Sequence, residues 1–223
     1  MHGGFGSLED FNSILLDLNK EFRVIGVDSR GQGKSTLGSN ELTYAQLQKD
    51  VERILEHLKI DTLSIIGFSD GGIVAYRLAP LTSLKVEKLV TIGSRWHKKN
   101  IDATREIFLK ITGKSWSNKF PATRDAYQKL NPEPNFDLLA QSVVRMWLDT
   151  TPSGCPNEAV KNISCPLLIV RGDDDYLLSR EAVVELSEQV KDSRLFNIPF
   201  AGHAAFEDQK EIFMLGLNRF LEG

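Results

Sequence analysis

The chain has 223 residues, of which 41% are hydrophobic and 26% charged, and its formal net charge is −3. These fractions are typical of a globular protein, and the slight acidity gives no reason to expect nucleic acid or an anionic membrane as a partner. The length suits one domain with room for an inserted subdomain. No apolar run approaches the ~18–20 residues of a membrane helix, and no basic-then-apolar leader opens the chain, so we expect a cytoplasmic protein.

The first sixty residues predict alternating helices and strands. Ser7, with Asp10 three residues later, begins an amphipathic helix whose apolar side chains recur at helical spacing. Residues 24–27 predict a strand, and a second helix spans about Thr43 to Leu58. This alternation of strand and helix is typical of an α/β protein.

A serine at the end of the next predicted strand, residues 63–67, is the most informative feature of the chain. A serine hydroxyl attacks well only where a base takes its proton and backbone N–H groups receive the oxyanion that forms. Glycines two residues before and two after Ser69 allow a sharp turn between a strand and a helix. The pattern G-x-S-x-G arises by chance in roughly one chain in ten of this length, but a chance match rarely lies on such a junction. We interpret it as a nucleophile elbow.

The second half returns to alternating elements after a long interruption. Residues 95–160 hold mixed polar and aromatic helical segments that are too long for a loop, so we predict an inserted helical cap. The core then comprises residues 1–94 and 161–223, with further strands at 88–93, 166–172 and 195–198, a helix capped by Ser179 and a last helix at 207–221. These repeated units predict an α/β fold with a mostly parallel sheet and helices on both faces.

A base and an acid that could serve the serine follow two of these strands. Of the four histidines, His203 lies in the loop after the last strand, where a parallel sheet places its functional residues. The loop after the 167–170 strand offers three acids, Asp173, Asp174 and Asp175, one of which would orient the imidazole. The alternatives are a solvated acidic turn and an ordinary surface histidine.

Five short motifs, taken together, resemble the α/β-hydrolase family over nearly the whole chain. In chain order they are His2-Gly3-Gly4, Asp28-x-Arg30-Gly31-x-Gly33-x-Ser35, Gly67-x-Ser69-x-Gly71, Gly172-Asp173-x-Asp175 and Gly202-His203. The resemblance implies that Ser69 is the nucleophile, Asp175 the triad acid and His203 the base, with the backbone N–H groups of Gly4 and Asp70 forming the oxyanion hole. It also implies hydrolysis of a small ester or amide through an acyl-enzyme, with no metal or organic cofactor.

The residue after the nucleophile suggests a branch of that family. The Ser-Asp-Gly-Gly elbow is similar to that of biphenyl-hydrolase-like and valacyclovirase-type enzymes, in which such an acid is a candidate for holding a substrate ammonium. The favoured alternative is that Asp70 is simply stabilised at a helix N-terminus. Trp96 and Trp147 are candidates for lining the substrate pocket, although such aromatic residues are more often core. We expect a monomer or homodimer.

The sequence departs from the family pattern at its N-terminus, because it starts at the His2-Gly3 motif and shows no strand before it. In the family, His-Gly follows a central strand that lies between the strands carrying the Asp28 and Ser69 loops. We therefore expect the strands at 23–27 and 63–67 to pair directly or to receive a strand from a neighbouring chain, with direct pairing slightly favoured because it needs no partner. Buried backbone groups left unpaired would each cost on the order of 1–3 kcal/mol.

Two other function classes compete with a hydrolase. Gly33-Lys34-Ser35 resembles the end of a phosphate-binding P-loop, but Asp28 stands where that motif needs its first glycine, and its carboxylate would repel phosphate. The second alternative is a catalytically impaired ligand-binding or signalling protein with the same fold. Assay with a short acyl ester discriminates it from an enzyme.

Overall fold

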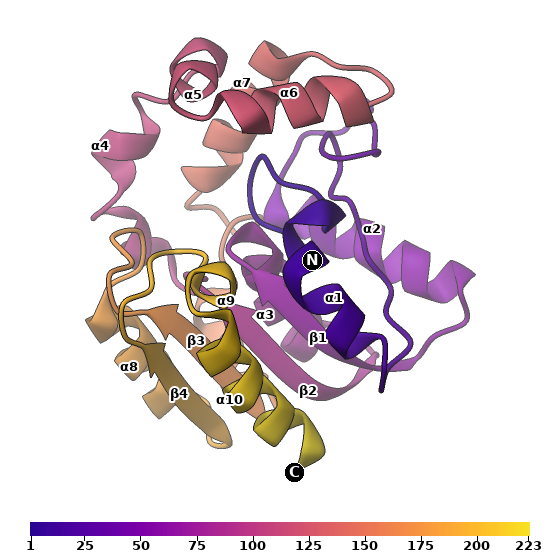
Figure 1. Ribbon diagram of the computed structural model, residues 1–223, viewed down its shortest axis with the longest axis vertical. Coiled ribbons are helices and arrows are strands. Elements are labelled where there is room, and N and C mark those ends of the chain that lie inside the picture. Colours follow the sequence, from indigo (N-terminus) through magenta and orange to yellow (C-terminus); the bar gives the residue numbers. More distant parts are fainter.

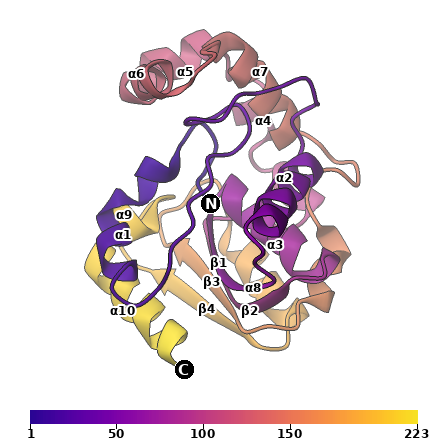
Figure 2. The ribbon, with the colours of Figure 1, turned by 90° about the vertical axis from the view of Figure 1, so that its right-hand side faces the viewer.

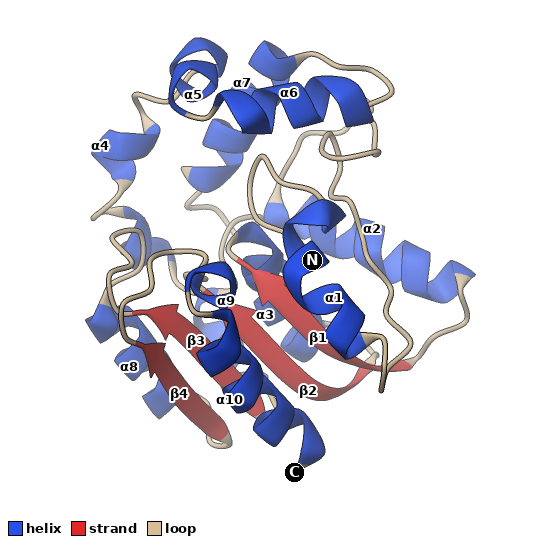
Figure 3. Cartoon of the chain, viewed as in Figure 1, coloured by secondary structure: helices blue, strands red, loops and turns tan.

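The computed structural model describes residues 1–223 and is built on one parallel sheet (Figure 3). Its four strands lie in chain order, each parallel to the next. They are β1 (Thr62–Phe68), β2 (Lys85–Ile92), β3 (Leu167–Gly172) and β4 (Ser193–Ile198). Every residue of β3 is buried, because this strand has a neighbour on each side and helices over both faces. The predicted α/β class and parallel sheet are confirmed.

Helices cover both faces of the sheet (Figures 1 and 2). One layer contains α1 (Asn12–Leu18), α9 (Ala205–Asp208) and α10 (Lys210–Glu222), and the other contains α2 (Tyr44–His57), α3 (Asp70–Leu81) and α8 (Arg180–Gln189). Each layer buries its own apolar cluster against the strands. No helix is both long and apolar enough to cross a membrane.

Side-chain caps begin the helices where the sequence predicts them. The Thr43 hydroxyl accepts from the backbone N–H of Gln46 at 3.0 Å and starts α2. Ser179 does the same for α8. Ser7 and Asp10 form a capping box, but the turn that they open, Leu8–Phe11, is a 3₁₀ helix that continues into α1. These caps satisfy N–H groups that a helix start leaves unpaired.

The predicted strand at residues 24–27 is wrong. This segment has no regular secondary structure and pairs with no strand, and a cavity of about 450 Å³, lined mainly by apolar side chains, lies between it and β1. Gly26 instead packs on Leu8, whose side chain lies where a Cβ on Gly26 would be. Met1 pairs with the edge of β1: its N-terminal amine donates to Ile66 O at 2.8 Å, and its carbonyl oxygen accepts from Phe68 N at 3.0 Å. Direct pairing, the slightly favoured expectation, therefore does not occur.

Four α-helices between β2 and β3 stand over the ends of the strands (Figure 1). They are α4 (Arg105–Phe108), α5 (Gly113–Lys119), α6 (Pro121–Leu130) and α7 (Phe136–Trp147), flanked by 3₁₀ turns at Lys98–Ile101 and Asn157–Asn162. We call residues 95–160 the cap. Its aromatic side chains pack on the N-terminal loop, where the rings of Phe5 and Trp116 lie 4.2 Å apart. The cap is thus held against the loop that contains Gly3 and Gly4.

Candidate active site

Ser69 lies on a sharp turn between β1 and α3, in backbone geometry that ordinary residues avoid. Its φ of 51° and ψ of −113° depart from both the strand and the helix that it joins. The flanking glycines are sterically required. A Cβ on Gly67 would lie 2.4 Å from Gly71 O, and one on Gly71 would lie 2.3 Å from Met1 O. The elbow predicted from the motif is therefore present, and its strain holds Ser69 out at the end of the strand.

The three predicted triad residues converge at this end of the sheet. His203 Nε2 lies 2.9 Å from Ser69 Oγ, and His203 Nδ1 lies 2.9 Å from Asp175 Oδ2. An ionised carboxylate only accepts hydrogen bonds, so Nδ1 carries the proton and Nε2 presents its lone pair to the hydroxyl. This arrangement has the geometry of a hydrogen-bond relay through which a base can activate a serine nucleophile.

The Asp175 loop is fixed by the buried Arg171 side chain. Arg171 donates to the carbonyl oxygens of Asp175 at 2.9 Å and of Leu178 at 2.7 Å. The second carboxylate oxygen of Asp175 accepts from the backbone N–H of Leu177 at 2.8 Å. Asp175 is 3% exposed, so its carboxylate faces the imidazole and the loop rather than water.

The side chains of Asp173 and Asp174 are not bonded to His203. Asp173 is exposed to solvent on one side and accepts from Arg180 and Asn197, bonds that lower the pKa of its carboxyl. Asp174 is exposed, and its backbone N–H donates to Ala201 O. Of the three adjacent acids, Asp175 alone contacts His203.

The loop after His2 lies directly against the elbow. His2 is buried, its Nε2 accepts from Ser29 N at 2.9 Å and its Nδ1 lies 2.7 Å from Gly3 O. A Cβ on Gly3 would lie 3.2 Å from Ser69 Cβ, and Gly71 N donates to His2 O at 3.0 Å. The structure therefore brings this loop beside Ser69, as the predicted oxyanion role of Gly4 requires.

Asp70 points away from solvent into a polar cluster beneath the cap. Its Oδ1 accepts from Tyr44 OH at 2.7 Å, and Trp147 Nε1 lies 2.9 Å and 2.8 Å from its two oxygens. Burial raises the pKa of this carboxyl, while the bonds from Trp147 and Tyr44 act in the opposite direction. With 4% exposure and both oxygens bonded to the protein, the side chain offers little to a substrate ammonium.

The two cap tryptophans considered for the pocket have different surroundings. Trp147 contacts the Asp70 carboxylate beside the elbow. Trp96 is 2% exposed, and its Nε1 donates to Ala182 O at 2.8 Å, which ties the start of the cap to α8. Two neighbours of Asp70 could not be predicted from the sequence: Tyr44, which donates to its carboxylate, and Arg95, whose positive charge acts to lower the pKa of that carboxyl. Tyr44 follows the Thr43 cap and Arg95 follows β2, positions that carry no motif.

The Asp28 loop does not have the form of a phosphate cradle. The carboxylate of Asp28 occupies the inside of the loop and accepts from Lys34 N at 2.8 Å and Leu8 N at 2.7 Å. A Cβ on Gly33 would lie 2.3 Å from the Asp28 carboxyl carbon. The N–H groups that a phosphate would need are thus directed at a carboxylate, in agreement with the argument against a P-loop.

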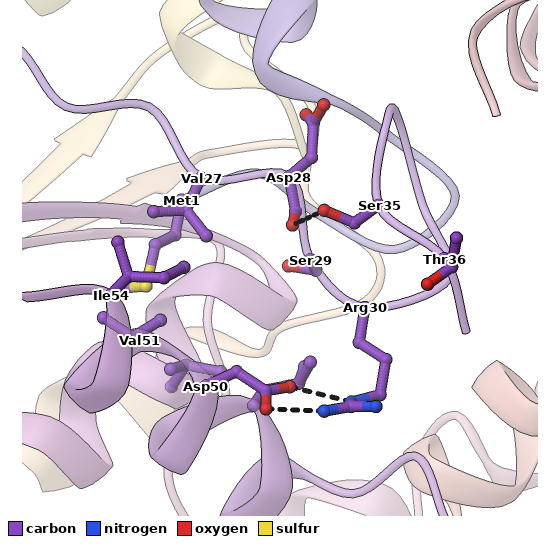
Figure 4. A pocket seen from close by; sticks show the side chains of 12 residues that line it. Met1, Val27, Asp28, Ser29, Arg30, Ser35, Thr36, Asp50, Val51 and Ile54 are labelled. Carbon is purple, nitrogen blue, oxygen red and sulfur yellow. Dashed lines mark hydrogen bonds and ion pairs between the residues drawn. The ribbon is translucent and has the colours of Figure 1, made fainter. Parts of the chain in front are cut away.

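A cavity of about 270 Å³ lies on the far side of this loop (Figure 4). Arg30 spans one wall and forms two hydrogen bonds with Asp50, at 2.8 Å and 2.6 Å. Apolar side chains, among them Met1 and Ile54, form the other end. None of the predicted triad residues lines this cavity, so we do not assign it to the candidate active site. No three His, Cys, Asp or Glu side chains gather where they could hold a metal ion.

Comparison with known proteins agrees with the fold. The family model of the alpha/beta hydrolase fold matches residues 1–127, more than half of the chain. The chain belongs to the α/β-hydrolase fold family. The esterase YbfF of Escherichia coli strain K12 is 27% identical to it over 99% of this chain and 91% of its own length. The human serine hydrolase BPHL is 29% identical over 90% of this chain and 70% of its own length.

Solved structures share the architecture. An esterase from Exiguobacterium antarcticum superposes with a TM-score of 0.80 at 22% identity, covering all of this chain and 90% of that one. A hydrolase from Pseudomonas aeruginosa PA01 has a TM-score of 0.77 at 21% identity, covering all of this chain and 88% of that one. At these identities the likeness concerns the fold. Together with the curated relatives, it identifies this chain as an α/β-hydrolase enzyme whose exact class is open.

Proposed function

We propose that this α/β hydrolase cleaves a small ester or amide through an acyl-enzyme on Ser69. The observation that carries the proposal is the continuous relay from Ser69 Oγ through His203 to Asp175, with both hydrogen bonds at 2.9 Å. A serine, an imidazole and a buried carboxylate in this order have the geometry of a nucleophile, its base and the group that orients the base.

In the first half-reaction, Ser69 Oγ attacks the substrate carbonyl carbon while its proton passes to His203 Nε2. Asp175 stabilises the imidazolium that forms. The oxyanion would accept from the backbone N–H groups of Asp70 and Gly4. His203 then returns the proton to the leaving alcohol or amine, and the acyl group stays on Ser69. In the second half-reaction, His203 takes a proton from water, hydroxide adds to the acyl carbon, and Ser69 leaves with the proton restored.

The test compares p-nitrophenyl acetate hydrolysis by the wild type, Ser69→Ala and Ser94→Ala. Ser94 is a matched control, because its buried hydroxyl lies at the end of β2 and donates only to Ile92 O. We expect Ser69→Ala to lose at least about 10³-fold in kcat with an unchanged melting temperature, and Ser94→Ala to retain the activity. Activity of Ser69→Ala within tenfold of the wild type would refute the proposal. A folded wild type without activity on any short ester would favour the ligand-binding alternative.

A further inference from the structure

The carboxylate of Asp70 joins the core of the enzyme to the cap. Its partner on the core side is Tyr44, the first residue of α2, whose hydroxyl donates at 2.7 Å. Its partner on the cap side is Trp147, the last residue of α7, whose indole N–H donates at 2.8 Å. All three side chains are buried, so each bond forms away from competing water. The residue that follows the nucleophile is thus anchored from both sides.

Gly4 lies against the same two side chains. A Cβ placed on Gly4 would be 2.5 Å from Trp147 Cζ2 and 2.7 Å from Asp70 Oδ2. No side chain fits there, which means that the backbone of Gly4 is packed directly on the indole and the carboxylate. The two residues expected to supply the oxyanion hole, Gly4 and Asp70, are therefore held relative to each other through Trp147.

A second set of contacts fixes the indole. The buried Arg95 donates from Nη2 to Trp147 O at 2.5 Å, and its guanidinium lies over the ring of Phe108 at 5.4 Å. The Trp147 ring also packs on Phe108 at 4.8 Å and edge-on to Phe5 at 5.5 Å. Because both its backbone and its ring are restrained, Trp147 has little freedom to move away from Gly4 and Asp70.

We infer that Trp147 and Asp70 act as a positioning pair that couples the last helix of the cap to the oxyanion hole. The inference rests on the proposed function, since it concerns the donors used in that reaction. The indole N–H of Trp147 binds the Asp70 carboxylate, and the edge of its ring packs on Gly4. The distance between the backbone N–H groups of Gly4 and Asp70 therefore depends on the position of Trp147, the last residue of α7. The pair acts on the transition state, where the oxyanion forms, and little on substrate binding.

The test is a comparison of Trp147→Phe with Trp96→Phe. Both substitutions keep an aromatic ring and remove one buried indole hydrogen bond, to Asp70 in the first case and to Ala182 O in the second. Removing an oxyanion donor costs about 10²–10³-fold in kcat, and a displaced donor costs less. We therefore expect Trp147→Phe to lower kcat by at least about tenfold with KM changed less than about threefold, and Trp96→Phe to lower kcat much less than Trp147→Phe does.

Two further variants check that the effect passes through Asp70. Tyr44→Phe removes the core-side bond and should lower kcat in the same direction, even if Trp147→Phe folds poorly. Asp70→Asn combined with Trp147→Phe should lose less than the product of the two single effects, because both disturb one contact. Equal kcat in the two tryptophan variants, or a rise in KM alone for Trp147→Phe, would overturn the inference. Neither outcome affects the Ser69 proposal, which Ser69→Ala tests separately.

Discussion

At the scale of single residues, burial and not charge distinguishes the acid that we propose for the triad. Three consecutive aspartates follow β3, and their charges are the same. Arg171 donates to the backbone carbonyl of Asp175 and so fixes the loop with the Asp175 carboxylate facing His203. The orientation of the loop thus places at His203 the same acid that the Gly172-Asp173-x-Asp175 motif singles out.

This difference predicts the effects of two matched substitutions. Asp175→Asn keeps the shape of the side chain, but it removes the charge that stabilises the imidazolium and can hold the wrong tautomer of His203. We expect kcat to fall by about 10³–10⁴-fold with little change in KM. Asp174→Asn, one position away and exposed, should stay within about twofold of the wild type. Steady-state kinetics on a short ester measures both, and similar losses in the two variants would contradict the assignment of Asp175.

Titration of His2 should contribute to the stability of the protein in mild acid. Burial lowers its pKa from 6.5 to about 4, and its Nε2 must stay unprotonated to accept from Ser29 N. As the pH falls from about 6.5 toward 4, the unfolded chain binds a proton that the folded protein does not. The free energy of unfolding therefore decreases by about 3 kcal/mol as the pH falls through this range.

The change His2→Gln should flatten that pH dependence. Glutamine still offers an acceptor to Ser29 N but does not titrate. Asp10 works in the opposite direction, because burial raises its pKa from 3.8 to about 6, so the informative quantity is the difference between variant and wild type. Urea unfolding between pH 4 and 7 gives this difference, with the exposed His57→Gln as control. A wild-type profile parallel to that of His2→Gln would show that His2 does not carry the effect.

At the scale of elements, the open edge of β1 is the least expected feature. The carbonyl of Ile66 and the N–H of Phe68 pair with Met1, while the N–H of Ser69 donates to Ile92 O in β2. Since backbone groups alternate sides along a strand, the N–H of Ile66 faces the 450 Å³ cavity and those of Ile65 and Gly67 face β2.

Amide hydrogen exchange should reveal this alternation. We expect the Ile66 amide to exchange at least about 100-fold faster than the amides of Ile65 and Gly67, because no strand covers it. Two-dimensional NMR in deuterated buffer resolves the three residues. Equal protection would mean that another backbone lies along β1 in solution, and sedimentation at two protein concentrations would then show whether a second copy supplies it.

Much of the fold could be predicted because its signals are local. Thr43 and Ser179 begin their helices where hydroxyl caps predict, and the four strands of the sheet coincide with apolar runs. The run at 24–27 has the same apolar character but pairs with no strand, since Met1 pairs with the edge of β1 and Leu8 packs on Gly26. Strand formation depends on a partner, which propensity alone does not reveal.

The candidate site also contains residues that the sequence predicts and residues that it does not. Ser69, His203 and Asp175 follow strands in a parallel sheet, so topology alone brings them to one end, and the motifs select them. The hydrogen-bond partners of Asp70 come from α2 and the cap, whose relative placement is a matter of tertiary packing. For this reason the sequence predicted a carboxylate at a helix N-terminus but not the indole and phenol that bind it.

At the scale of the whole molecule, the cap, the N-terminal loop and the sheet meet at one place, and Ser69 lies there. The proposed mechanism requires that this serine, and no other group, carries the acyl group during turnover. Rapid mixing of the enzyme with p-nitrophenyl acetate, an acid quench and intact-protein mass spectrometry test this requirement directly, with peptide mapping to locate the adduct. We predict a gain of one acetyl group at Ser69 that is absent in Ser69→Ala and strongly reduced in His203→Ala. Continued turnover with no adduct, or an adduct on another residue that forms at the rate of turnover, would contradict the account.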